Sequence, residues 1–192
     1  MRLLGLTGGI GAGKSEALAA LGRLGAATLS SDAVVHELLA TREVAALVGE
    51  RFGLEVAPGG AVDRRALAER VFADPEARSW LEGLLWPRVE ARVRAWRAEL
   101  EAESSSPPVG VVEVPLLFEA GMEGLFDATL AVVSERAGER AAARGHAGAA
   151  GRTARQLPQE EKAARADLVV RNDGDLRTLE RALSPVLARM EA

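Results

Sequence analysis

Short apolar runs alternate with longer amphipathic stretches along the whole chain. Five runs lack the polar alternation of a half-exposed strand, which indicates strands buried on both faces. They are Leu3–Thr7, Ala27–Leu29, Val109–Val114, Ala128–Val133 and Leu168–Arg171. Because helical stretches separate these runs, the sequence predicts an α/β fold with a parallel sheet covered by helices on both faces.

Helical spacing and capping residues define the stretches between the strands. The predicted helices are Ser15–Leu24, Asp32–Leu39, Arg42–Phe52, Asp63–Phe72, a long region from Asp74 to Glu103, Glu135–Arg144 and Asp175–Met190, with two short helices after the loose stretch Gly145–Gly151. Asp63 and Asp74 are expected to cap their helices, and Pro75 suits a first helical position. Pro87 is expected to break or kink the long region near Trp86.

The length of 192 residues fits a single domain over residues 1–192. The stretch Asp63–Glu103 contains no predicted strand. We therefore expect a helical insertion at about 63–103, placed over a site for an acceptor substrate. A helix followed by a glycine-rich stretch, at about 135–156, is expected to form a lid.

Composition narrows the range of functions. The net charge is −4 with acids and bases mixed along the chain, which argues against general nucleic-acid binding. The chain has no cysteine and only two distant histidines, His36 and His146, so disulfides, thiol catalysis and a protein-built zinc site are not expected. No apolar run reaches membrane length, so the expected location is the cytoplasm, and no segment indicates an obligate protein partner. Lys14 and Lys162 are the only lysines.

A glycine-rich segment between the first strand and the first helix carries the strongest signal. It consists of Gly8, Gly9, Ile10, Gly11, Ala12, Gly13, Lys14 and Ser15, and matches the pattern G-x-x-x-x-G-K-[ST]. The glycines allow backbone N–H groups to point inward at phosphate oxygens, and the helix start adds partial positive charge. Lys14 is expected to reach the β- and γ-phosphates, and the Ser15 hydroxyl to coordinate Mg²⁺. The segment predicts binding of a nucleoside triphosphate with magnesium.

Two carboxylates lie at or just beyond the ends of predicted strands. Asp32 lies just beyond the second strand, where it could accept a proton from an attacking hydroxyl group. The alternative is that Asp32 only caps the next helix. Glu113 lies at the end of an apolar strand, like a Walker B acid, and could hold a magnesium-bound water. A structural role for this buried acid is the alternative.

Arg136, Arg140 and Arg144 are spaced by four residues and so share one face of a predicted helix. Arg136 and Glu139 are the only plausible oppositely charged neighbours. Each like-charge pair costs roughly 0.2–0.5 kcal/mol unless an anion bridges it, and phosphate is the obvious anion. The column therefore predicts phosphate contacts from a lid. The alternative is a solvated arginine face that reflects the bias of this chain toward arginine.

With these features together, the sequence resembles the dephospho-CoA kinases over nearly its whole length. The matching segments are Gly5–Ser15, Asp32, Asp63-Arg64 with Leu67, Val71-Phe72, Pro115–Glu119, Arg140, Arg144, Arg152, Gln156, Ala166-Asp167, Asn172 and Gly174. The Pro-Leu-Leu-Phe-Glu stretch at 115–119 and the lid pattern make the resemblance specific.

The resemblance implies a fold of the P-loop NTPase type, with a five-stranded parallel sheet, a helical CoA-binding region and a lid. It also implies phosphoryl transfer from ATP to the ribose 3′-hydroxyl of dephospho-CoA, the last step of coenzyme A synthesis. Asp32 would be the base, Arg140 and Arg144 the lid arginines, and Asn172 would lie near the adenine of ATP. The sequence departs from the family pattern at Glu16, Ser30, Trp86 and Ala137.

Three other functions stay open at this point. The chain could phosphorylate a different small molecule or a nucleoside monophosphate, since the architecture is shared. It could be a nucleotide-dependent switch, although the Asn-Lys-x-Asp segment common in guanine switches is missing from the sequence. It could also be a family member without activity, because Ser30 and Trp86 alter the acceptor side.

Overall fold

The computed structural model describes residues 1–143 and 156–191 and divides the chain into two compact units. Met1–Ser31 and Val93–Ala192 make up the first unit, and Asp32–Arg92 the second. The sheet and the glycine-rich segment belong to the first unit.

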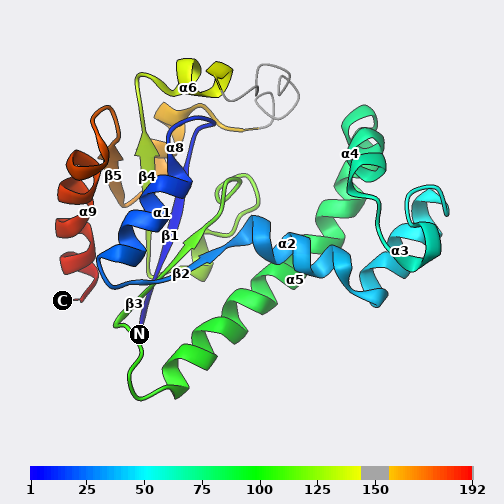
Figure 1. Ribbon diagram of the computed structural model, residues 1–192, viewed down its shortest axis with the longest axis horizontal. Coiled ribbons are helices and arrows are strands. Elements are labelled where there is room, and N and C mark those ends of the chain that lie inside the picture. The colour runs from blue at the N-terminus through cyan, green and yellow to red at the C-terminus, as the bar shows by residue number, and fades with distance from the viewer. Residues whose placement is uncertain (144–155, 192) are drawn as a thin grey trace. The chain divides into compact units, whose positions relative to one another are not determined.

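Five parallel strands form one sheet in the order β2-β3-β1-β4-β5 (Figure 1). The strands are β1 (Arg2–Gly8), β2 (Ala27–Ser30), β3 (Val109–Glu113), β4 (Ala128–Val133) and β5 (Leu168–Arg171). The helices of this unit include α1 (Lys14–Arg23), α6 (Ala137–Ala143), α8 (Gln159–Arg165), α9 (Leu176–Glu191) and the short 3₁₀ helix η2 (Glu123–Leu125). The predicted parallel α/β sheet is confirmed. β4 and β5 have the predicted ends, and the ends of β1, β2 and β3 differ from the prediction by one residue at most.

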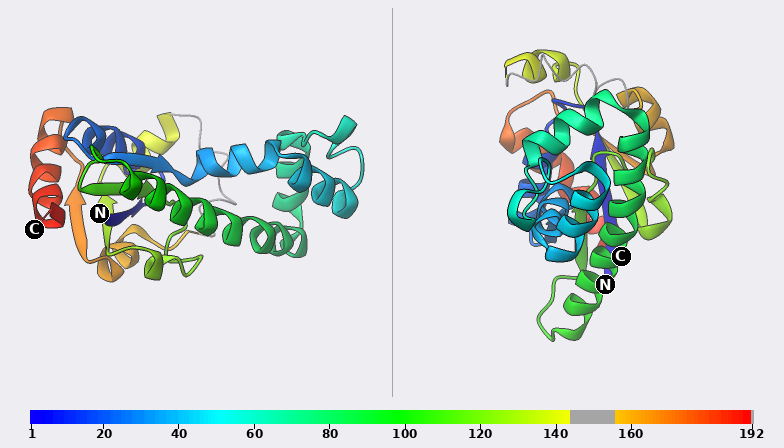
Figure 2. Two further views of the ribbon diagram at one scale, coloured as in Figure 1. Left: turned by 90° about the horizontal axis from the view of Figure 1, so that it is seen from below. Right: turned by 90° about the vertical axis from the view of Figure 1, so that its right-hand side faces the viewer.

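Successive residues of a strand face opposite sides of the sheet, and both sides are apolar. Leu4 and Leu6 pack in one cluster with residues of α1 and α9. On the other side, Gly5 leaves room for Leu117 and Phe126, because a Cβ atom there would lie 2.7 Å from both side chains. The ribbon views place α1 and α9 on one side of the sheet and α8 on the other (Figure 2). Burial on both faces explains why the strands are continuous apolar runs.

The second unit is built from helices. They are α2 (Ser31–Ala40), α3 (Arg42–Phe52), α4 (Arg64–Ala73) and the first part of α5 (Pro75–Ala102), with the 3₁₀ helix η1 (Pro58–Gly60). Their apolar core includes the rings of Phe52 and Trp80, which meet edge to face with centroids 5.2 Å apart. Asp63 and Asp74 accept backbone N–H groups of the following helical turns, so both predicted caps are confirmed.

The predicted break at Pro87 is wrong, because α5 runs from Pro75 to Ala102 without interruption. A kink, the other outcome expected at Pro87, stays a prediction. A proline inside a helix removes one backbone hydrogen bond and costs about 3 kcal/mol. Leu85 and Val89, on either side of Pro87, are both buried. Burying side chains of this size contributes about 1.5–3 kcal/mol each. Tertiary packing therefore outweighs the local preference of proline.

The predicted helix at 135–144 is present as α6, from Ala137 to Ala143. Gly145–Gly151 lies outside the described residues. Of the two short helices predicted after it, the described part of the chain contains α8. The last helix, α9, begins one residue later than predicted and ends one residue later.

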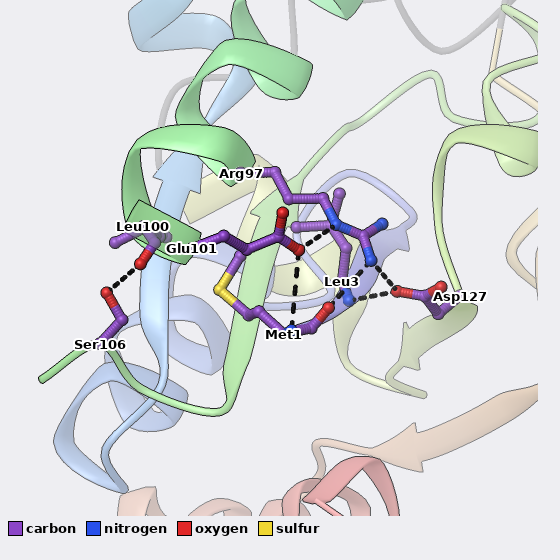
Figure 3. Close-up of polar contacts among 7 residues, drawn as sticks. All are labelled: Met1, Leu3, Arg97, Leu100, Glu101, Ser106 and Asp127. Carbon is purple, nitrogen blue, oxygen red and sulfur yellow. Dashed lines mark hydrogen bonds and ion pairs between the residues drawn. The ribbon is translucent and has the colours of Figure 1, made fainter. Parts of the chain in front are cut away.

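A network of charges joins the start of β1 to the end of α5 (Figure 3). Arg97 Nη2 donates to the carbonyl oxygen of Met1 at 2.9 Å and lies 3.4 Å from Asp127. Asp127 in turn accepts the backbone N–H of Leu3 at 2.6 Å. The Met1 ammonium lies 3.6 Å from Glu101, whose pKa is lowered mainly by its hydrogen bond from Arg97. These contacts hold the end of β1 that is farther from the glycine-rich segment.

A carboxylate between α8 and β5 makes the stability of the fold depend on pH. Asp167 Oδ2 accepts hydrogen bonds from the hydroxyl group and the backbone N–H of Thr129, each at 2.8 Å. The Thr129 hydroxyl, followed by the Thr129 N–H, lowers the pKa of Asp167 below its ordinary value of 3.8. The carboxylate therefore contributes stability above pH 3.8 that is lost as the pH falls through the folded-state pKa.

Asp167→Asn is expected to lower the free energy of unfolding by about 0.5–1 kcal/mol near neutral pH, because a neutral amide accepts weaker hydrogen bonds. The difference from the parent should shrink below pH 3.8. Urea unfolding across a pH series measures both effects. Glu69→Gln, on the exposed face of α4, is the matched control and should change stability little. A difference at Asp167 that is independent of pH would contradict this account.

Candidate functional site

The glycine-rich segment forms a loop between β1 and α1. Gly11 and Gly13 have φ values of 79° and 90°, in the left-handed region that glycine adopts readily. The N–H of Ala12 donates to the carbonyl oxygen of Gly9 at 3.2 Å and closes a turn within the loop. Helix α1 begins directly after Gly13. The strand–loop–helix context that the motif requires is therefore present.

Neighbouring segments of the chain pack closely against this loop. A Cβ atom would lie within 2.3 Å of a neighbouring atom at three positions: Gly8 beside Val132 O, Gly11 beside Ala137 O, and Gly13 beside Asn172 Nδ2. Cβ atoms do not approach other atoms so closely, so any side chain would displace the loop or its neighbours. Glycine is required here both by the backbone curl and by the packing of β4, α6 and the end of β5.

The two residues predicted to bind Mg²⁺ lie side by side. The Ser15 hydroxyl donates to Glu113 Oε1 at 3.3 Å, across a sequence separation of 98 residues. Glu113 is buried at the end of β3, in register with Leu6 of β1 and Ser30 of β2. Lys14 Nζ donates to the carbonyl oxygen of Gly9 at 3.1 Å, so its charge lies over the loop. The parallel sheet thus brings the predicted phosphate-binding and metal-binding groups together.

Asp32 is the first residue of the second unit and lies in the first turn of α2, where it is exposed. Ser30 and Ser31, which precede it, belong to the unit that contains the sheet. Among the described residues, no N–H group of α2 donates to the Asp32 carboxylate. The capping alternative therefore receives no support from a hydrogen bond, and the role of Asp32 as a base stays a prediction.

Arg140 and Asn172 form a bridge to the glycine-rich loop. Arg140 Nη1 donates to the carbonyl oxygen of Asn172 at 3.0 Å. The side-chain amide of Asn172 donates to the carbonyl oxygen of Ala12 at 2.9 Å, and Asn172 is buried. Asn172 thus joins the loop to α6. Its predicted place near the adenine of ATP is not tested by this contact.

Arg136 and Arg144 are the other two arginines of the column. Arg136 pairs with Glu139 at 3.4 Å, as the sequence indicated for these neighbours. Arg144 lies outside the described residues. Arg140 is therefore the one member of the column, within the described part of the chain, that reaches the loop through a neighbour.

Sequence reasoning missed the residues that hold the start of α6. Asp173 Oδ1 accepts hydrogen bonds from the Ser134 hydroxyl and the Glu135 N–H, each at 2.8 Å. The Ser134 bond is the main cause of a lowered pKa of Asp173. Ser134 follows β4 and Asp173 follows β5, which pair in parallel. Polar residues at the ends of these adjacent parallel strands were the signal in the sequence that could have identified the pair.

The described residues contain no group of three or more His, Cys, Asp or Glu side chains that could hold a metal ion by themselves. Within the same residues, no helix has the length and apolar character needed to cross a membrane.

The five-stranded parallel sheet, its glycine-rich loop and the Ser15–Glu113 pair define a P-loop NTPase-type protein. Comparison with known proteins narrows this class. Residues 2–178 match the family model for dephospho-CoA kinase. The dephospho-CoA kinase of Anaeromyxobacter dehalogenans is 44% identical over 181 residues, which cover 91% of this chain and 85% of that protein. The dephospho-CoA kinase of Deinococcus radiodurans is 41% identical over 195 residues, covering 99% and 93%. The chain belongs to the dephospho-CoA kinase family.

Solved structures agree with the fold. A crystal structure of a Thermus thermophilus protein superposes with a TM-score of 0.77 at 39% identity, covering 98% of this chain and 97% of that one. Dephospho-CoA kinase from Campylobacter jejuni superposes with a TM-score of 0.71 at 24% identity, covering 98% and 96%, and supports the fold alone. The five-stranded fold implied by the sequence resemblance is confirmed.

Proposed function

We propose that this chain transfers the γ-phosphoryl group of ATP to the ribose 3′-hydroxyl of dephospho-CoA and so completes coenzyme A. The observation that carries the proposal is the intact P-loop with Lys14, Ser15 and Glu113 gathered at one end of the sheet, in a chain that matches the dephospho-CoA kinase family over residues 2–178. In the reaction a bond forms between O3′ and Pγ, and the bond from Pγ to the β,γ-bridging oxygen breaks. ADP leaves, and the proton of the hydroxyl group passes to a base.

The oxygen atoms of Ser15 and Glu113 suit a magnesium ion. Mg²⁺ prefers hard oxygen ligands and is usually held by one or two protein groups together with phosphate oxygens and water. A hydroxyl group and a carboxylate 3.3 Å apart beside the phosphate loop meet this requirement. When bound, the ion would neutralise charge on the β- and γ-phosphates.

The remaining roles fall to residues of this chain. The N–H groups of the P-loop and the Lys14 ammonium would hold the β- and γ-phosphates in place. Asp32 would orient the 3′-hydroxyl group and accept its proton. The helical region at about 63–103 would bind the CoA portion, and the region at about 135–156 would act as the lid. ATP and dephospho-CoA would be the only partners that the reaction requires, and we expect it to take place in the cytoplasm.

The acceptor is tested by measuring ADP release with ATP, Mg²⁺ and a panel of acceptors. Dephospho-CoA should support turnover and yield a product phosphorylated at the ribose 3′ position, identified by mass spectrometry and phosphorus NMR. Turnover with a nucleoside monophosphate in its place would favour the alternative kinase. ATP binding without turnover on any acceptor would favour a switch, or a family member that has lost activity through changes such as Ser30 and Trp86.

We expect Arg140, which lies in α6, to contact the phosphates of ATP. Its guanidinium donates to the carbonyl oxygen of Asn172, whose side-chain amide donates to Ala12 in the P-loop. Arg140→Ala should lower turnover roughly 10- to 100-fold, because a positive charge is lost from the transition state, and leave thermal stability nearly unchanged. Arg136→Ala is the matched control, since Arg136 pairs only with Glu139 among the described residues. Earlier melting of the Arg140 variant with full specific activity would show a structural role.

A further inference from the structure

The second lysine of the chain is fully buried, although the chemistry described above does not use it. Lys162, in α8, has a relative exposure of 0%. Its Nζ donates to the carbonyl oxygen of Pro115 at 2.5 Å and lies 2.9 Å from Glu119 Oε1. Both partners belong to the Pro115–Glu119 stretch that follows β3. A fully buried lysine is rare in proteins and requires partners of this kind.

The position of the Pro115 carbonyl explains why a donor is needed there. The Val114 N–H donates to Leu6 O at 2.8 Å and continues the ladder between β3 and β1. β3 ends at Glu113 while β1 continues to Gly8, so the ladder between the two strands stops there. Lys162 supplies the next donor, and the Thr7 hydroxyl lies 3.4 Å from the same carbonyl oxygen. The ammonium thus holds the backbone two residues after Glu113.

Stability alone is a poor explanation for this arrangement. Burial is the main cause of a lowered pKa of Lys162, and the contact with Glu119 opposes it. Among the described residues, Glu119 Oε2 is buried without a hydrogen-bond partner, while Oε1 accepts the Leu157 N–H at 2.8 Å. Apolar residues of similar volume often replace buried ion pairs without loss of stability. Apolar residues cannot, however, bond to the Pro115 carbonyl group and the Glu119 carboxylate and so fix their positions.

We propose that Lys162 is a positioning residue of the kinase, which fixes the turn after β3 and thereby keeps Glu113 beside Ser15. The kinetic consequences of this inference rest on the proposed function. Its structural consequence, the fixed position of the turn after β3, does not. Groups that orient metal-binding residues without contacting the metal themselves typically contribute a factor of about 10–100 to metal affinity or activity. The Lys162 ammonium bonds to the Pro115 carbonyl oxygen and pairs with Glu119, so it would act on Glu113 through the backbone of residues 113–115.

Lys162→Met keeps the length of the side chain and removes the ammonium. Turnover should fall roughly 10- to 100-fold, and the Mg²⁺ concentration for half-maximal activity should rise by about the same factor. Thermal melting gives a second measurement that needs no acceptor. The stabilisation of the Lys162→Met variant by ATP with Mg²⁺ should be smaller than that of the parent, while its stabilisation by ATP in EDTA should not change. Leu183→Ala, in the core on the opposite face of the sheet, is the control for a general loss of stability. It should melt earlier and keep the Mg²⁺ dependence of the parent.

Two further variants separate positioning from packing. Lys162→Met with Glu119→Gln removes the unpaired buried carboxylate but keeps an acceptor for the Leu157 N–H. This double variant should melt at a higher temperature than Lys162→Met and keep its low turnover, because Pro115 still lacks a donor. Lys162→Cys creates the only cysteine of the chain. Alkylation of that thiol with 2-bromoethylamine in denaturant, followed by refolding, restores an ammonium and should restore the Mg²⁺ dependence, whereas refolded, unalkylated protein should not.

The outcomes are distinct. If Lys162→Met keeps the Mg²⁺ dependence of the parent in both readouts, or if Leu183→Ala shifts it equally, Lys162 is structural and the inference is overturned. If the parent chain does not phosphorylate dephospho-CoA, the proposed function fails. The thermal-shift comparison with and without Mg²⁺ still tests Lys162 in that case, because it needs no acceptor.

Discussion

Lys14→Ala should lose phosphoryl transfer by about 10²-fold or more while the protein stays folded. The side chain carries an ammonium within the P-loop itself, and its Nζ lies 3.1 Å from the Gly9 carbonyl oxygen. In phosphoryl transfer, negative charge spreads over the γ-phosphoryl oxygens in the transition state. A fixed positive charge in a site shielded from water stabilises that state, and removal of one such group typically costs about 10²–10³ in turnover.

Steady-state kinetics with ATP and dephospho-CoA measure the loss, and thermal melting measures the fold. Arg23→Ala is a matched control, because Arg23 is a cation near the other end of α1 that forms a surface pair with Glu180. Surface pairs of this kind contribute about 0–1 kcal/mol to stability, so the control should keep its turnover. Turnover of Lys14→Ala within a few-fold of the parent would show that Lys14 does not serve the phosphates.

Asp32→Asn should reduce turnover by about 10²- to 10⁴-fold, the usual range for a general base, with ATP affinity and stability nearly unchanged. A ribose hydroxyl group is a poor nucleophile at neutral pH. The loose transition state does not require early deprotonation, but the hydroxyl must be oriented and its proton must be accepted. Ser30, one of the positions at which the sequence departs from the family pattern, cannot take over, because a neutral hydroxyl group is a very weak base.

The asparagine variant distinguishes the two interpretations of Asp32. Asparagine keeps the size and much of the capping ability of aspartate but lacks the basic oxygen. Glu37→Gln, on the same helix and exposed, is the control for loss of a negative charge on α2. If Asp32→Asn loses about 1 kcal/mol of stability and turns over normally, Asp32 is a cap. Glu113 would then be the next candidate for the base.

The sequence was sufficient for features encoded in contiguous residues. The P-loop from Gly8 to Ser15 could be predicted because its pattern, its preceding strand and its following helix all lie within one short stretch. The caps at Asp63 and Asp74 were equally local, since each carboxylate bonds to N–H groups two or three residues away. Local hydrogen bonds of this kind depend little on the rest of the fold.

Local reasoning failed where packing outweighed a local preference. Pro87 signals a break in any isolated segment, and α5 nevertheless continues through it because buried side chains on both sides stabilise the helix. The arginine column was also only partly informative. Spacing placed Arg136 and Arg140 on one face, but their partners differ, because one lies near Glu139 and the other near the end of β5.

By itself, the sequence determined the class of fold and the glycine-rich loop, and it predicted the residues that would bind ATP, because each of these is encoded in the periodicity or spacing of neighbouring residues. Only the tertiary structure decided which distant groups meet. Ser15 lies beside Glu113, Asn172 bonds to Ala12 across 160 residues, and Lys162 bonds to Pro115 across 47. Those pairings depend on the strand order β2-β3-β1-β4-β5, which brings the ends of non-consecutive strands together, and no local pattern in the sequence encodes that order.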